Sequence, residues 1–228
     1  MLAITFRYLP KHCINACIFC SNEVLSSPDI PEKDIDSDFQ KMKEQFLTYV
    51  SLHRRDIICI TGNDPIQLGV PRLVELFDLI RSYEYTIGFM STHGRLLAKD
   101  DLQVLKEHGL LALQIPLYGS TAEIHNGITR PKIGDAFSDT VKTLEFCEQL
   151  GISIIGNIRI VRENRSDIQN IIRLYKDLCP TKLETINLGG VIAQLGIMEN
   201  AQRFLSKDEE RALIESFSAN DPLVTKVY

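Results

Sequence analysis

Three of the chain's six cysteines, Cys13, Cys17 and Cys20, lie close together in the stretch KHCINACIFCSN, and no fourth cysteine is near them. In a reducing compartment, clustered thiols are more typical of metal or redox sites than of disulfides. Three thiolates bound to three irons of a [4Fe–4S] cluster leave the fourth iron open to an external ligand. An open coordination position is where metal sites do chemistry. The spacing therefore predicts a cluster-binding loop that leaves room for one more ligand.

Zinc is the alternative for these thiols, because the three cysteines together with His12 or His93 would make a plausible tetrahedral site. Zinc knuckles and ribbons generally use paired C-x2-C hairpins, and the sequence has no second pair. The remaining cysteines, Cys59, Cys147 and Cys179, are scattered in apolar or amphipathic stretches. We expect them to be small buried hydrophobic side chains.

Short β-branched runs alternate with stretches of helical period, which predicts six βα units and right-handed crossovers between parallel strands. The fold expected is α/β, a partial (β/α)6 TIM-like barrel that forms a single domain over residues 1–228. The segment 22–36, rich in Pro, Ser and acidic residues, is expected to be a surface loop. The predicted strands are 2–9, 56–61, 85–91, 110–117, 152–161 and 184–190, and the predicted helices are 36–53, 70–82, 99–108, 134–150, 166–178 and 206–218.

Parallel α/β sheets bind ligands at the carboxyl ends of their strands. The cysteines follow the first predicted strand, and every other unusual cluster also follows a strand. We therefore expect one rim of the barrel to carry them all. The clusters after the second to sixth strands are TGNDP, STHGR, PLYGST, VRENR and GGV.

The composition is that of a globular protein, with 228 residues, 44% hydrophobic and 24% charged. A formal net charge of −5 disfavours nucleic acid or an anionic membrane as the main partner. The N-terminal segment lacks the pattern of a signal peptide, and the chain has no apolar run long enough to span a membrane. These features predict a soluble, cytoplasmic protein.

With Phe19 before the third cysteine, the motif reads C-x3-C-x-aromatic-C and resembles the hallmark of the radical S-adenosylmethionine (radical SAM) superfamily. The resemblance implies that the amino and carboxylate groups of S-adenosylmethionine bind the open iron. It also implies that an electron from the reduced cluster cleaves the sulfonium to a 5′-deoxyadenosyl radical, which abstracts hydrogen from a substrate. The electron would come from a reductant such as flavodoxin or ferredoxin.

The stretch TGNDP stands where this family has a Gly-Gly-Glu-Pro-like motif that receives the ammonium group of the cosubstrate. Gly62 and Pro65 fit that pattern, whereas Asn63 and Asp64 depart from it. His93 stands where the family often has asparagine. It is a candidate cofactor contact, or else a loop histidine bonded to backbone.

The later strands resemble the segments of the family that contact the rest of the cosubstrate. Gln114 and Ser120 are candidate polar contacts after the fourth strand. Asn157 and Arg159 share one face of the fifth strand, because side chains alternate. Arg159 would face either the carboxylate of the cosubstrate or a core ion pair. Gly189 would allow the backbone to approach adenine closely, or would only form a turn.

The substrate is less clearly indicated, and the sequence assigns no catalytic residue. There is no C-terminal block of cysteines for auxiliary clusters. The stretches IPLYG, STHGRLL and GIMENAQRF (196–204) are similar to peptide maturases of the His-Xaa-Ser type, which favours a peptide or protein substrate. The alternatives are a glycyl-radical-enzyme activase, an enzyme that modifies small molecules or nucleosides, and a degenerate barrel that serves as a binding scaffold.

Overall fold

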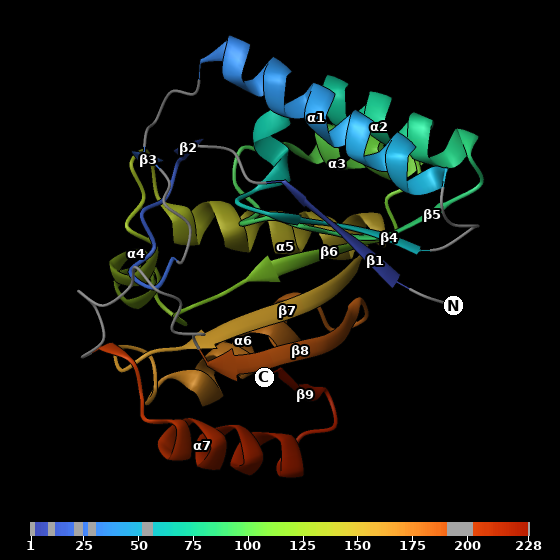
Figure 1. The fold of residues 1–228 in the computed structure, drawn as a ribbon. Helices are drawn as coiled ribbons and strands as arrows, with labels where there is room; N and C mark the ends of the chain where they lie inside the picture. The colour runs from blue at the N-terminus through green and yellow to red at the C-terminus, as the bar shows by residue number, and fades with distance from the viewer. Residues whose placement is uncertain are drawn as a thin grey trace.

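The structure is a computed structural model that describes residues 3–8, 12–20, 25–26, 31–51, 57–190 and 203–227. Its centre is a seven-stranded sheet in which all neighbouring strands are parallel and the strand order follows the chain, β1-β4-β5-β6-β7-β8-β9. The sheet curls into a half-barrel (Figure 1). The strands are β1 (Ala3–Tyr8), β4 (Ile57–Gly62), β5 (Thr86–Ser91), β6 (Ala112–Pro116), β7 (Ser153–Ile160), β8 (Leu183–Gly190) and β9 (Val224–Val227).

Helices cover the outer face of the sheet, and the main hydrophobic core lies between the two layers (Figure 1). The alternation in β7 shows the principle: Ile154, Ile158 and Ile160 are buried in that core, whereas the residues between them are half-buried on the other face. The helices are α1 (Glu32–Val50), α2 (Val70–Ser82), α3 (Lys99–Glu107), α4 (Ala122–Thr129), α5 (Ala136–Leu150), α6 (Ile168–Leu178) and α7 (Lys207–Asn220), together with the short 3-10 helix η1 (Pro65–Leu68).

Helix α5 forms part of the wall around the candidate active site, and both of its ends are capped. The Asp135 carboxylate accepts hydrogen bonds from the backbone N–H groups of Phe137 (3.0 Å) and Ser138 (3.3 Å). These bonds satisfy donors that have no partner inside the helix. Gly151 ends the helix with a φ of 69°, a conformation that glycine adopts at little cost.

The predicted half-barrel is confirmed, and all six predicted strands are present within a few residues of their expected ends. Several features differ. Helix α1 begins at Glu32, so the end of the expected 22–36 loop is helical, and strand β3 (Leu25–Ser26) also lies within that loop. The short helix η1 was not predicted either. Helix α4 was not predicted, because its eight residues are too short for a clear periodic pattern. Strand β9 adds a seventh strand beside β8.

The carboxyl ends of the strands gather at one end of the half-barrel, and the cysteine segment lies there (Figure 1). A two-stranded parallel pair, β2 (His12–Cys13) and β3 (Leu25–Ser26), lies beside it. Within the described ranges, no helix combines the length and apolarity that crossing a bilayer requires.

Candidate active site at the carboxyl ends of the strands

The cysteine loop, residues 13–20, is held by backbone hydrogen bonds to the end of α4 and the segment after it. Ala16 N–H donates to the Thr129 carbonyl at 3.0 Å, and Ile18 N–H donates to the Ile128 carbonyl at 3.0 Å. Lys132 N–H donates back to the Ile14 carbonyl at 2.9 Å. These bonds give an irregular loop the fixed backbone that a cofactor site needs.

Cys13, Cys17 and Cys20 lie close enough together for their charges to interact. The pKa of Cys13 is raised to about 12, chiefly by burial and to a smaller extent by the Asp64 carboxylate and Cys20. Burial also raises the pKa of Cys17 well above its usual range, and Cys13 and Cys20 add to the effect. Cys13 and Cys17 are therefore neutral unless a cation joins them, and iron binding would displace their protons.

The three thiols do not converge on one point. In the part of the chain that the structure describes, no group of three His, Cys, Asp or Glu side chains is arranged to hold a single metal ion. A tetrahedral zinc site needs such convergence. In a cubane cluster, by contrast, each thiolate binds its own iron.

The turn after β4 lies directly against the cysteine loop. The Cys13 Sγ is 3.7 Å from the Asn63 carbonyl oxygen, which accepts its hydrogen bond. Gly62 has a φ of 130° and Asp64 a φ of 125°, so the turn depends on backbone conformations that side chains other than glycine rarely adopt. Pro65 then begins η1 and is buried. The structure thus places all four residues of the predicted motif beside the thiols.

Asp64 is a buried carboxylate with one satisfied oxygen. Its Oδ1 accepts a hydrogen bond of 2.6 Å from the Thr92 hydroxyl, whereas its Oδ2 has no partner among the described residues. Burial raises the pKa of Asp64 to about 7, although Thr92 and the backbone of His93 and Ile66 lower it. The buried Oε1 of Gln67 also has no partner there. Two acceptors beside the cysteine loop therefore lack donors, and such groups are rare in folded proteins.

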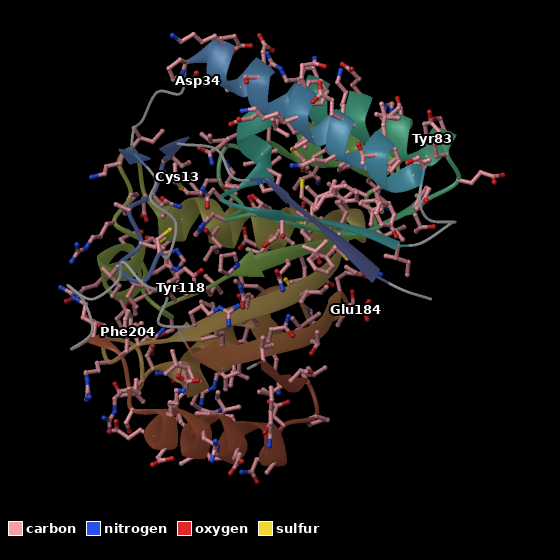
Figure 2. The ribbon with its side chains drawn as sticks, viewed as in Figure 1. Cys13, Asp34, Tyr83, Tyr118, Glu184 and Phe204 are labelled. Carbon is pink, nitrogen blue, oxygen red and sulfur yellow. The ribbon has the colours of Figure 1, made fainter. Side chains whose placement is uncertain are left out.

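An aromatic group borders the loop on the other side. The rings of Phe19 and Tyr118 meet edge to face with centroids 4.8 Å apart, and His93 meets Tyr118 in the same way at 6.3 Å. The pKa of His93 is lowered to about 4, chiefly by burial and also by the charge of Arg95. His93 is therefore neutral at pH 7. Figure 2 shows Tyr118 and Cys13 at the same end of the sheet, far from Glu184 at the start of β8.

The predicted residues of β6 to β8 lie in two groups. Arg159 and Gly189 are adjacent: the Arg159 Nη1 donates to the Gly190 carbonyl at 3.4 Å, and a Cβ on Gly189 would lie 2.9 Å from that Nη1. The charge of Arg159 also acts on Tyr118, so it reaches the aromatic group. Gln114 and Asn157 are half-buried on the sheet face opposite the helices.

Ser120 has a local partner that the sequence does not reveal. Its hydroxyl donates to Asp167 Oδ1 and its N–H to Asp167 Oδ2, both at 2.7 Å. Asp167 precedes α6, so this contact connects the loop after β6 to the start of that helix. The structure thus gives Ser120 a structural partner, while its role as a cofactor contact stays a prediction.

Sequence reasoning overlooked several buried polar side chains of the site, although each follows a strand end or lies in the cysteine loop. The largest is Arg95, which is 1% exposed and donates to Asn15. The signal available was a charged residue directly after the glycine of STHGR. The others are Asn15, Gln67 and Thr92.

These residues fit a cluster and its cosubstrate. Three thiols on one loop suit a cluster with an open iron. The partnerless oxygens of Asp64 and Gln67 suit an ammonium donor. The half-buried Arg159 suits a carboxylate. The site therefore has complementary groups for both polar ends of an amino acid that lies beside the thiols.

Fold and site together define a parallel half-barrel with a three-thiol loop at the rim of its strands. A family model described as "Radical SAM superfamily" matches residues 8–175. The chain belongs to this superfamily of enzymes. Membership implies that a [4Fe–4S] cluster and S-adenosylmethionine are the cofactors.

Three proteins show the range of similarity. The AdoMet-dependent heme synthase of Oleidesulfovibrio alaskensis is 26% identical over 171 residues, which is 74% of this chain and 41% of that protein. The coproporphyrinogen III oxidase HemN of Escherichia coli matches with a TM-score of 0.68 at 13% identity, over 95% of this chain and 51% of that one.

Streptococcus suis SuiB, solved with its precursor peptide SuiA, matches with a TM-score of 0.70 at 12% identity, over 100% of this chain and 49% of that one. At such identities the two structural likenesses show the fold alone. The chain spans about half the length of these relatives or less.

Proposed function

We propose that this chain is the core of a radical SAM enzyme that abstracts hydrogen from a peptide or protein substrate. The observation that carries the proposal is the cysteine loop beside two buried oxygens, Asp64 Oδ2 and Gln67 Oε1, that have no donor among the described residues. When bound, the cluster and S-adenosylmethionine supply a 5′-deoxyadenosyl radical.

Cys13, Cys17 and Cys20 hold the cluster; Cys13 is buried, and the other two are half-buried. The turn Gly62–Pro65 and the Asp64 carboxylate receive the ammonium group of the cosubstrate. Arg159, which faces away from the helix-side core, receives its carboxylate. The close packing of Arg159 on Gly189 fixes the guanidinium. His93, Gln114, Ser120, Asn157 and Phe19 complete the proposed cofactor contacts.

The peptide assignment is supported by the stretches IPLYG and STHGRLL, which are similar to peptide maturases. SuiB, solved with its precursor peptide, shares the fold over the whole of this chain. The third stretch that favours this assignment, 196–204, lies mostly outside the described residues. A small-molecule substrate is the second candidate, because the heme synthase relative shares 26% identity over 171 residues.

Anaerobic reconstitution tests the proposal. The chain should bind about four irons and, with dithionite or reduced flavodoxin, release 5′-deoxyadenosine from S-adenosylmethionine. Cys17→Ala should abolish both. Cys147→Ala is the matched control, since Cys147 is a fully buried thiol on the core side of α5 and this variant should load iron normally.

The outcomes separate the alternatives. If the wild-type chain binds no cluster or releases no 5′-deoxyadenosine, the scaffold alternative replaces the enzyme. If it does both, deuterium transfer from labelled candidates into 5′-deoxyadenosine identifies the substrate. Transfer from a peptide supports the maturase assignment, transfer from a tetrapyrrole or nucleoside supports the small-molecule candidate, and transfer from a glycyl-radical enzyme supports the activase.

A further inference from the structure

Arg95 is the largest side chain among those that are fully buried, and it lies at the cluster end of the sheet. Arginine is almost never fully buried without a specific partner set. Gly94 before it and Leu96 after it both have positive φ values, of 73° and 61°. Leu96 is 56% exposed, so this turn points the apolar side chain outward and the charged one inward. A non-glycine residue in that conformation costs free energy, so the surrounding structure must hold the arginine in its inward position.

Helix α5 holds this turn in place. The Thr140 hydroxyl donates to the His93 carbonyl at 2.8 Å, and the Thr143 hydroxyl donates to the Gly94 carbonyl. A Cβ on Gly94 would lie 3.3 Å from Thr143, so the approach is close. The position of Arg95 is therefore set by the helix as well as by the strand.

The guanidinium reaches three segments that are distant in sequence. Its Nη1 donates to Asn15 Oδ1 in the cysteine loop at 2.8 Å, and its Nε donates to Asp139 Oδ2 on α5 at 3.0 Å. Its Nη2 donates to the Ile133 carbonyl. Asn15 lies between the first two cysteines, so one hydrogen bond joins the positive charge directly to the loop that holds the thiols.

The charge of Arg95 is only partly balanced at the site. Asp139 is its single ion-pair partner among the described residues, and the Asp139 side chain is 44% exposed. Water screens an exposed carboxylate far more than a buried guanidinium. Because the guanidinium is hydrogen-bonded to Asn15, its charge lies beside the cysteine loop.

We propose that Arg95 is a positioning residue that fixes the cysteine loop through Asn15 and favours the one-electron reduced form of the cluster. The inference rests on the proposed function, since it needs the cluster. A low-potential donor of the flavodoxin or ferredoxin class supplies one electron, and the cluster gains one negative charge. A nearby buried positive charge stabilises that product more than the reactant.

The test measures the ratio of reduced to oxidised cluster by electron paramagnetic resonance in redox-poised anaerobic samples. Arg95→Gln removes the charge but keeps a polar side chain, and it should lower that ratio about tenfold at a fixed potential, a shift of about 59 mV for one electron. Arg95→Lys retains the charge and should restore most of the ratio.

Asp139→Asn supplies the decisive comparison, because it removes the exposed anion and leaves Arg95 in place. If charge matters, Asp139→Asn raises the ratio while Arg95→Gln lowers it. If Arg95 is only a structural link, both variants break the same contact and the ratio moves in one direction or not at all. Either of these last results overturns the proposal.

Iron content and thermal unfolding are measured on every variant. If Arg95→Gln fails to load iron, the other two variants decide. The proposal then requires a higher ratio of reduced to oxidised cluster in Asp139→Asn and a near-wild-type ratio in Arg95→Lys. If the wild-type chain itself loads no cluster, the proposed function fails rather than this inference.

Discussion

Replacement of Asp64 by Asn should make the cofactor-free chain more stable at neutral and alkaline pH. The pKa of Asp64 is raised from 3.8 to about 7, chiefly by burial. The folded chain therefore binds this proton more tightly than the unfolded chain does. The resulting stability is fully present below pH 3.8 and is lost as the pH rises through 7.

The size of this effect follows from the shift. A difference of about 3 pKa units at about 1.36 kcal/mol each amounts to about 4 kcal/mol. The free energy of unfolding of the wild-type chain should fall by that amount between pH 4 and pH 8, relative to that of Asp64→Asn. For a domain of this size, each kcal/mol is worth about 2–4 °C in Tm.

The same substitution should weaken the binding of S-adenosylmethionine to the reconstituted chain. An amide offers one acceptor oxygen where the carboxylate offers two, and Oδ1 is already engaged by Thr92. Loss of a hydrogen bond to a charged group costs about 1.5–3 kcal/mol, or about 10- to 100-fold in Kd.

Chemical denaturation of the cofactor-free chain from pH 4 to pH 8, followed by titration calorimetry with the cosubstrate, measures both effects. Asp100→Asn, which removes an exposed carboxylate from the first turn of α3, is the control. Parallel stability profiles for wild type and Asp64→Asn would refute the reasoning about burial. Unchanged affinity would remove Asp64 from the cosubstrate site.

Two further substitutions test the walls of the site. Gly189→Ala should weaken cosubstrate binding at least about tenfold and also lower Tm. The reason is that the new Cβ would lie 2.5 Å from the Val227 carbonyl oxygen and 2.9 Å from Arg159 Nη1. Wild-type binding and a wild-type Tm would show that the backbone relaxes freely. Tyr175→Phe should destabilise the chain by about 1–3 kcal/mol in urea unfolding. The buried hydroxyl donates to the Ile115 carbonyl at 2.7 Å and accepts from Asn157 N–H at 3.2 Å, and both bonds would be lost. A loss of stability below about 0.5 kcal/mol would contradict this account.

Local patterns in the sequence predict much of the fold and part of the site. The strands are visible because β-branched runs alternate with helical periods, and the rim follows because parallel strands end on the same side. Cys13, Cys17 and Cys20 lie within one short segment, so their meeting needs no long-range information. The same holds for the turn from Gly62 to Pro65. That residues 1–228 form one domain stays a prediction.

The sequence does not predict contacts that join distant segments. Arg95 meets Asn15 across 80 positions and Asp139 across 44, and an arginine after a strand normally points to solvent. Ser120 meets Asp167 across 47 positions. A single sequence carries no signal for these pairs, because each depends on how the crossovers bring the loops together.

The backbone bonds between the cysteine loop and residues 128–132 have a consequence for biosynthesis. The segment that holds the cysteine loop is made more than a hundred residues after the thiols. A nascent chain that ends before α4 therefore carries three cysteines without the backbone bonds that order them. We expect thiols in that state to be more open to oxidation or to the wrong metal than thiols in the folded loop.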